Sequence, residues 1–220
     1  MSNIQYVNGG TNATSIAGTS LTLTYSPTSG NEIVCGIYTS ANITGLGCAD
    51  NNGNGLTPSP YNPQNRASLF FGTAVSGATS YTFSWTGNSG AVCALVEYAN
   101  VVGIGSGGGT ASGSSNLPTI SNTTTAVNSV IVAFVLETVG TTFSQNTGNL
   151  RQKDTDTQIT ATVGLNDNTA SSVGSSVTNA ISAVSSNSWY IISLEMYPAP
   201  PIVSAGFGEE YQFSFDDSCF

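Results

Sequence analysis

The sequence contains no histidine and only three basic residues, Arg66, Arg151 and Lys153. A Ser-His-Asp or Cys-His relay needs an imidazole that exchanges a proton near neutral pH, and catalytic zinc sites usually use imidazole as a ligand. Binding of phosphates and nucleic acids needs clustered lysine or arginine. The sequence therefore argues against these functions, and we expect a protein that is not an enzyme, uses no cofactor and binds no nucleic acid.

Charged residues are scarce altogether, at 7% of the chain, and the 12 acidic residues leave a net charge of -9. An acidic surface repels nucleic acids and anionic membranes. No apolar run is long enough to span a bilayer, and residues 1–5 have neither the basic nor the apolar region of a secretory signal. We expect a protein that is made in the cytoplasm of a host cell and has no membrane partner.

Short segments with alternating apolar and polar residues are abundant instead. Leu21, Leu23 and Tyr25 alternate with threonines, and the segment Tyr81–Trp85 alternates in the same way. A period of two places the large side chains on one face of a strand, and polar turn residues separate the segments. Further strands are predicted at 32–39, 67–75, 91–98, 130–137, 158–165 and 189–197. The predicted fold is all-β, a two-sheet antiparallel β-sandwich of the jelly-roll or immunoglobulin-like type with a C-terminal extension.

The predicted organisation is one sandwich domain over residues 19–198, between an N-terminal arm at 1–18 and a C-terminal assembly tail at 199–220. Leu95-Val96-Glu97-Tyr98 is echoed by Leu194-Glu195-Met196-Tyr197, which we interpret as two strands in similar settings and not as a duplication. The glycine- and serine-rich run from Gly103 to Asn116 is predicted to be a surface loop.

The order of the strand and turn segments resembles that of a loosely defined β-sandwich family found in phage virion proteins and in bacterial surface proteins. The resemblance covers about residues 19–198 and rests on Leu21–Tyr25, Gly30–Cys35, Asp50–Asn54, Arg66–Phe70, Tyr81–Trp85, Val96–Tyr98 and Trp189–Met196. These segments carry fold and not chemistry, so the resemblance implies no catalytic residue. The loop Leu56–Gln64 and the chain beyond Pro201 lie outside the pattern, and we expect the features particular to this protein there.

A candidate metal site is formed by Asp50, Asn52 and Asn54, which with Gly55 match the opening of a calcium-binding loop. Tyr61 stands where that loop needs its closing glutamate. An ordinary turn rich in asparagine and glycine explains the same residues without an ion, and we favour this alternative.

Three further features suggest chemistry but have simpler explanations. Gly103 to Gly108 satisfies a G-x-G-x-x-G pattern, but no helix is predicted after it, so a linker is preferred to a phosphate site. Glu97 and Glu195 would suit the paired carboxylates of a glycosidase, although carboxylates at the ends of apolar strands commonly just face solvent. Tyr61, in a loop with three prolines, would suit stacking on a sugar ring.

Four cysteines are present. Cys35 and Cys93 lie in apolar segments and are expected to be buried thiols. If Ala41-Asn42 forms a two-residue hairpin, Cys35 falls opposite Cys48, which makes this pair a candidate disulfide. We favour reduced thiols, because a chain without an export signal starts in a reducing compartment.

The C-terminal tail has a strand pattern outside the predicted sandwich. Aromatic residues alternate there with polar ones, and we expect them to be buried on a neighbouring subunit or in another groove of an assembly; these residues are Phe207, Tyr211, Phe213, Phe215 and Phe220. The alternative is that the tail folds back onto its own domain.

Together these features predict a non-enzymatic structural protein of a phage virion. An outer capsid decoration or cement protein is preferred, with a tail or fibre component as the nearest variant. Its expected partners are other virion proteins and further copies of itself. The alternative is a carbohydrate-binding surface module, a lectin-like adhesin that binds surface glycans at the cell surface or outside the cell.

Overall fold

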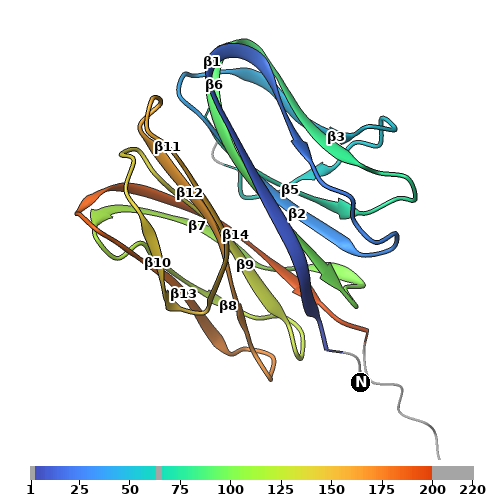
Figure 1. Cartoon of the computed structure of the whole chain (residues 1–220). Coiled ribbons are helices and arrows are strands. Elements are labelled where there is room, and N and C mark those ends of the chain that lie inside the picture. The colour runs from blue at the N-terminus through green and yellow to red at the C-terminus, as the bar shows by residue number, and fades with distance from the viewer. Residues whose placement is uncertain (1–2, 63–65, 200–220) are drawn as a thin grey trace, which may run out of the picture.

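The computed structural model describes residues 3–62 and 66–199. Within these ranges the chain forms antiparallel strands and no helix (Figure 1). The strands are β1 (Gln5–Thr24), β2 (Glu32–Thr39), β3 (Thr44–Asp50), β4 (Thr57–Pro58), β5 (Ala67–Thr73), β6 (Ser80–Ala99), β7 (Gly103–Ser115), β8 (Thr119–Thr123), β9 (Val130–Glu137), β10 (Phe143–Thr147), β11 (Asn149–Asp156), β12 (Ala161–Thr169), β13 (Ser176–Ala183) and β14 (Asn187–Tyr197). The predicted all-β sandwich class is confirmed.

The strand order shows that the chain holds two copies of one sandwich. In the first repeat, β1 to β6, the main sheet has the order β1-β6-β2-β5-β4, and β3 also pairs with β6. In the second repeat, β7 to β14, the main sheet has the order β7-β14-β9-β12-β11, and a second sheet has the order β8-β13-β10. These orders become the same if β1 corresponds to β7 plus β8, and β6 to β13 plus β14. The single sandwich predicted from the sequence is therefore a double one, and the two segments that we interpreted as strands in similar settings, and not as a duplication, occupy matching positions in the two repeats.

The long strands β1 and β6 explain this correspondence, because each takes part in two layers. Residues 5–14 of β1 pair with residues 91–99 of β6, and residues 20–24 pair with residues 80–84. The register shifts around Gly18, where the two strands bend over together. In the second repeat the same bends are breaks that separate β7 from β8 and β13 from β14.

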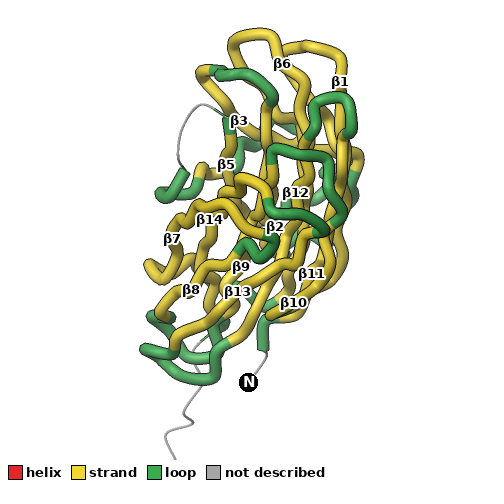
Figure 2. The backbone as a smooth tube through the Cα atoms, turned by 90° about the vertical axis from the view of Figure 1, so that its left-hand side faces the viewer, coloured by secondary structure: helices red, strands yellow, loops and turns green. Residues whose placement is uncertain are grey.

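The repeats pack face to face, so that the molecule has four layers (Figures 1 and 2). The two main sheets enclose an apolar interface core to which both repeats contribute. Many of its members occupy matching positions in the two repeats, such as Val34 and Val132, Val96 and Leu194, or Leu69 and Leu165.

Gly36 and Phe134 occupy matching positions and face each other across this core. A Cβ atom on Gly36 would lie 2.2 Å from Cδ2 of Phe134. A position that meets its own counterpart is expected where two copies are related by a two-fold axis. Here the phenyl ring of one repeat fills the space that glycine leaves in the other.

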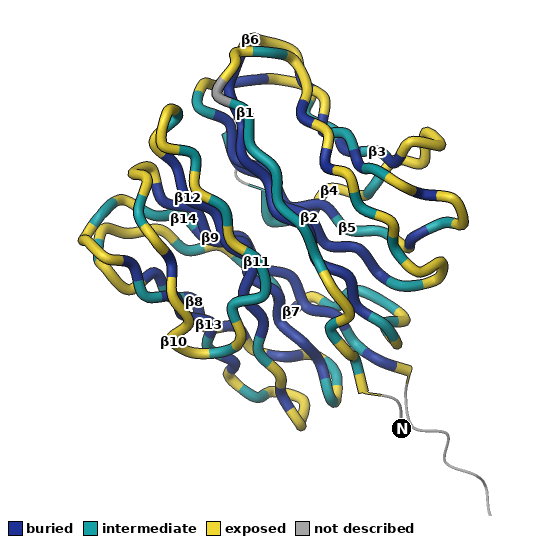
Figure 3. The backbone as a smooth tube through the Cα atoms, viewed as in Figure 1, coloured by how far each residue is buried: buried dark blue, intermediate teal, exposed yellow. Residues whose placement is uncertain are grey.

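The main-sheet strands β2 and β9 begin and end where the sequence predicts them. Apart from Glu32, Thr39 and Glu137 at their ends, they have no polar side chains, because both of their faces are buried (Figure 3). Ile33 and Cys35 of β2 face the core inside the first repeat, whereas Val34 and Tyr38 face the interface core.

The core inside the first repeat is aromatic, and the matching core of the second repeat is partly polar. Phe70, Tyr81 and Phe83 are fully buried in the first. Asn166 and Asn179 take the positions of Phe70 and Tyr81 in the second, where they donate hydrogen bonds to the carbonyls of Thr147 and Ile131. Trp85 is buried as expected, like the other two aromatic residues of the alternating segment, Tyr81 and Phe83.

Two other expectations are wrong. Most of the predicted N-terminal arm belongs to β1, which pairs with β6 from Gln5 onward. The predicted loop at Gly103–Asn116 is the edge strand β7, whose partner is β14. Small side chains do not prevent a strand when the neighbouring strand supplies the backbone hydrogen bonds. Across its described ranges the chain has no helix of the length and apolarity that crossing a membrane would take.

Candidate functional site

The aromatic residues of the predicted assembly tail lie outside the described residues, as does Cys219. The described chain ends leave the same end of the molecule (Figure 1). The carbonyl of Asn3 accepts a hydrogen bond from the side chain of Asn100, and the carbonyl of Tyr197 accepts one from the amide of Val102. The described part of the chain therefore ends at the end of the sandwich where β1 begins.

The candidate calcium residues form a hydrogen-bonded turn. Oδ1 of Asp50 accepts bonds from the backbone amides of Asn52 and Asn54, each at 2.9 Å, and the side-chain amide of Asn54 donates to both carboxylate oxygens. Gly53 adopts a left-handed conformation with φ of 84°. The carboxylate of Asp50 thus accepts hydrogen bonds from amide groups of its own turn, and these bonds lower its pKa against the effect of burial. The turn rich in asparagine and glycine explains the positions of these residues without an ion.

Cys35 and Cys48 are brought together, but not by the predicted hairpin. The strand β3 pairs with β6 rather than with β2, so the two cysteines belong to opposite layers of the first repeat. Their Sγ atoms are 3.7 Å apart in its core, and Cys93 is buried in the same core. Cys35 and Cys48 are both buried free thiols. Burial raises the pKa of the Cys35 thiol.

Glu97 and Glu195, the candidate carboxylate pair, occupy the same position in the two repeats and are both buried. Glu195 accepts hydrogen bonds from the backbone amides of Gly107, Thr125 and Ala126 and from the hydroxyls of Thr125 and Ser129. Burial opposes ionisation of Glu195, but the hydrogen bonds outweigh it and lower its pKa.

Glu97 does the same in the first repeat, where it accepts bonds from the hydroxyl of Tyr25, the amide of Thr28 and the side chain of Asn31. Its pKa is lowered by these bonds against the effect of burial. Each glutamate therefore holds the loop that enters β2 or β9. The expectation that they simply face solvent is wrong.

Tyr61 and the glycine-rich segment meet each other. The ring of Tyr61 packs on β7 at Gly108, where a Cβ atom would lie 2.5 Å from Cε2 of the ring, and its hydroxyl donates to the carbonyl of Ser106. The glycines thus admit the tyrosine ring, and no helix N-terminus follows them. Tyr61 is half-buried and tied to β7, which does not favour the stacking role considered for it.

The structure also reveals a hollow that the sequence did not suggest. It has a volume of about 420 Å³ and lies between the ends of β2 and β5 in the first repeat and the start of β7 in the second. We call it the Glu32 hollow. Its lining combines apolar side chains with polar groups and one acidic side chain, and consists of Glu32, Thr57, Phe71, Gly72, Thr73, Val101, Val102, Gly103 and Ile104.

Glu32 is the first residue of β2 and lies opposite Thr73 of β5. Only 9% of its surface is exposed. Burial raises the pKa of its carboxyl group, and a 3.2 Å hydrogen bond from the Thr73 hydroxyl to Oε2 offsets this only in part. In the described part of the chain, Oε1 of Glu32 has no hydrogen-bond or ionic partner.

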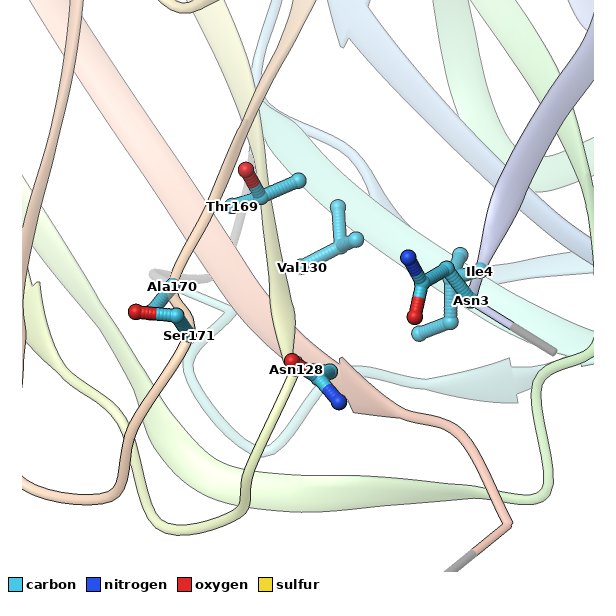
Figure 4. A pocket seen from close by; sticks show the side chains of 7 residues that line it. All are labelled: Asn3, Ile4, Asn128, Val130, Thr169, Ala170 and Ser171. Atoms are coloured by element: carbon cyan, nitrogen blue, oxygen red, sulfur yellow. The ribbon is translucent and has the colours of Figure 1, made fainter. Parts of the chain in front are cut away.

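The matching place in the other repeat is a smaller hollow of about 300 Å³ (Figure 4). Val130 stands there in the position of Glu32, and Thr169 in that of Thr73. Asn3 and Ile4 line this hollow as Val101 and Val102 line the larger one. The two hollows are therefore copies of one crevice, and only one of them has a carboxylate.

The edge strands of the two repeats differ in length. The long strand β11 brings Arg151 to Asp167 at 2.8 Å and stacks it over the ring of Tyr6. The corresponding strand β4 has only two residues. Phe71 and Ile104 line the Glu32 hollow on the side of its repeat that has the short strand.

The signal that could have drawn attention to this hollow is Glu32, an acidic residue at the start of an otherwise apolar segment. Nothing in the sequence placed β7 beside it, since β7 was predicted to be a loop. Comparison with family models, curated proteins and solved structures gives no match. The family resemblance therefore depends on the strand and turn residues alone.

Proposed function

We propose that this chain is a non-enzymatic structural protein of a phage virion, an outer capsid decoration or cement protein or else a component of the tail or fibre. In this function the double sandwich is displayed on the particle and the segment 199–220 attaches it. The main support is that both described chain ends lie at one end of the sandwich, so that a single attachment point leaves the rest of the surface free.

The arrangement of the acidic side chains is in keeping with a structural role. Glu97 and Glu195, the two carboxylates considered as a glycosidase pair, both accept hydrogen bonds on each oxygen from neighbouring loops. A general acid or base must be within reach of a substrate proton, and neither carboxylate lines a described hollow.

The proposal is tested on particles from the organism that carries the coding sequence. Antibodies raised against the recombinant protein should label purified phage particles at regular positions in negative-stain images, and the intact chain should be found in their proteins by mass spectrometry. Particles that contain no such chain and are not labelled would contradict a virion function.

A carbohydrate-binding surface module is the second candidate. It is favoured by the Glu32 hollow, where a half-buried aromatic ring and a carboxylate line the same site. The apolar face of a sugar can stack on such a ring, and the hydroxyls of the sugar can donate to the carboxylate. A glycan array probed with the purified chain tests this function. Binding that is lost in Glu32→Gln, together with absence from particles, would favour the module over the virion protein.

A further inference from the structure

The Glu32 hollow contains a carboxylate that the chain itself does not neutralise. Oε1 of Glu32 accepts no hydrogen bond from the described residues and is not closed off from solvent, although only 9% of the surface of the residue is exposed. An opposite charge within a few ångströms favours the ionised form of such a carboxylate. The open oxygen is therefore available to a positively charged group that enters the hollow.

The three basic side chains of this protein are all engaged elsewhere. Arg66 donates to the carbonyls of Thr39 and Ser40 and lies over the ring of Tyr38. Arg151 pairs with Asp167, and Lys153 donates to the carbonyl of Phe143 at 2.7 Å. None of them lines the hollow. A lysine or arginine that pairs with Glu32 must therefore come from another molecule.

The rest of the lining selects for an apolar stem. Phe71, Val101, Val102 and Ile104 surround the carboxylate, and Val102 is 57% exposed at the hollow. A long basic side chain has this combination of parts, with methylene groups that pack on apolar surface and a charged head. A compact, strongly hydrated ion would leave the apolar wall uncovered.

From this arrangement we infer that the Glu32 hollow is a binding site for an alkylammonium group, in which the ammonium pairs with Oε1 of Glu32 and its methylene stem packs on Phe71, Val102 and Ile104. The group comes either from a lysine side chain of a partner protein or from a free aliphatic amine. The inference does not depend on the proposed virion function. The matching hollow, which has Val130 in place of the glutamate, is not a site of this kind.

The test uses the full chain labelled with ¹⁵N and titrated with two amines that separate the sources. The probe n-butylammonium represents a free amine, and Nα-acetyl-lysine N-methylamide represents a partner's side chain. We expect saturable shifts of the amides of residues 71–73 and 101–104, with a Kd of about 1 mM, as is reasonable for one ion pair and a short stem in an open site. The neutral probe 1-pentanol should bind at least tenfold more weakly.

The decisive variant is Glu32→Gln, which keeps the shape of the side chain and an acceptor for Thr73. This substitution should raise the Kd of both amines at least tenfold. The matched control is Asp154→Asn on β11, which removes the same charge away from the hollow and should leave both Kd values unchanged. Binding of n-butylammonium alone would assign the site to free amines, and binding of both probes would also admit a partner's lysine.

Several results would overturn the inference. Equal binding of 1-pentanol and n-butylammonium would show that the carboxylate plays no part. Equal loss in Glu32→Gln and Asp154→Asn would show only a general charge effect. Shifts centred on Thr169–Ser171 instead of residues 101–104 would place the amine in the wrong hollow. If Glu32→Gln fails to fold, the competition between 1-pentanol and n-butylammonium on the unaltered chain still decides the question.

Discussion

At the scale of single residues, one position carries the same buried carboxylate in both repeats. Glu195 has five hydrogen-bond donors and Glu97 has three. Since these bonds lower the pKa of both groups in the folded protein, folding is favoured by their ionisation. The stability that they contribute is complete above the unfolded pKa of about 4.3 and is lost as the pH falls through the lowered folded pKa.

We therefore predict that Glu195→Gln destabilises the protein by about 2 to 3 kcal/mol at pH 7, because its amide group would face donors that need an acceptor. Glu97→Gln should cost less, since fewer donors lose their partner. Urea unfolding at pH 7 and at pH 3 measures both effects. The difference between each variant and the unaltered chain should shrink at pH 3, because the unfolded chain is then protonated at these glutamates and the stability that their ionisation contributes is reduced; a difference that is independent of pH would contradict the assigned role.

Gly36 is the residue on which the contact between repeats depends most directly. A methyl group at this position would collide with the ring of Phe134. We predict that Gly36→Ala destabilises the protein by about 1 to 3 kcal/mol, the usual cost of overpacking. Thermal unfolding measures it, with Gly47→Ala as control, because a Cβ on Gly47 meets nothing within 4 Å.

The double variant Gly36→Ala with Phe134→Leu provides a further check. If the ring of Phe134 is what the new methyl group meets, the smaller side chain should relieve part of the strain, and the two free-energy changes should not add. Strict additivity would mean that Gly36 matters for another reason, such as its backbone.

At the scale of elements, the limits of a strand could be predicted best where both of its faces are buried. The strands β2 and β9 are buried on both faces and read as continuous apolar runs, so their limits were correct. The strand β7 was missed because its glycines and serines signal a loop. It is held by pairing with β14 and by the side chain of Tyr61, whose hydroxyl donates to the carbonyl of Ser106. Such long-range partners are invisible in a local pattern.

The repeat itself was missed for a related reason. Matching positions share burial, but many differ in identity: Gly36 corresponds to Phe134, Phe70 to Asn166, and Glu32 to Val130. Pairs in contact across a two-fold axis must differ if one is to fill the space of the other. The Glu32 hollow also depends on this difference between the repeats. The sequence shows the acidic residue, but not which segments surround it in the fold.

The cysteine pair links two elements, β2 and β3, that lie in different layers. We predict that oxidised glutathione, with enough urea to admit it, converts Cys35 and Cys48 into one disulfide and releases two molecules of reduced glutathione. The Sγ atoms need to move together by less than 2 Å from their 3.7 Å separation, given a bond length of about 2.05 Å. The closed loop is short, so the expected stabilisation is about 3 kcal/mol.

Peptide mapping under non-reducing conditions measures the crosslink, and urea unfolding measures its effect. Cys93→Ala should leave the crosslink intact, whereas Cys48→Ala should abolish it. A dominant bond that involves Cys93 would show that the pair is not the reactive one.

At the scale of the whole molecule, the double sandwich behaves as a dimer within one chain. The interface core joins matching faces of the two repeats, so neither main sheet is left with an exposed apolar face. The molecule thus needs no partner to complete its core, and an assembly contact has to use other surfaces. The segment 199–220, with its alternating aromatic residues, is the best available one in the sequence.

Deleting residues 202–220 should accordingly leave a folded molecule, because among the described residues the last paired strand ends at Tyr197. If Tyr211, Phe213 and Phe215 are buried on the particle, each contributes about 1.5 to 3 kcal/mol before the cost of ordering the segment. The shortened chain should therefore fail to bind particles that lack the protein, while the full chain rebinds. Sedimentation of particles with bound chain measures this, and circular dichroism monitors folding.

A full-length variant in which these three aromatic residues are serines separates the aromatic contribution from the effect of length. It should bind as poorly as the shortened chain. The acidic residues Glu209, Glu210, Asp216 and Asp217 flank the aromatic ones, so binding of the unaltered chain should weaken modestly with salt while the aromatic part persists. Normal binding of the shortened chain would show that the particle holds the sandwich itself, and unfolding on truncation would show that the segment belongs to the sandwich.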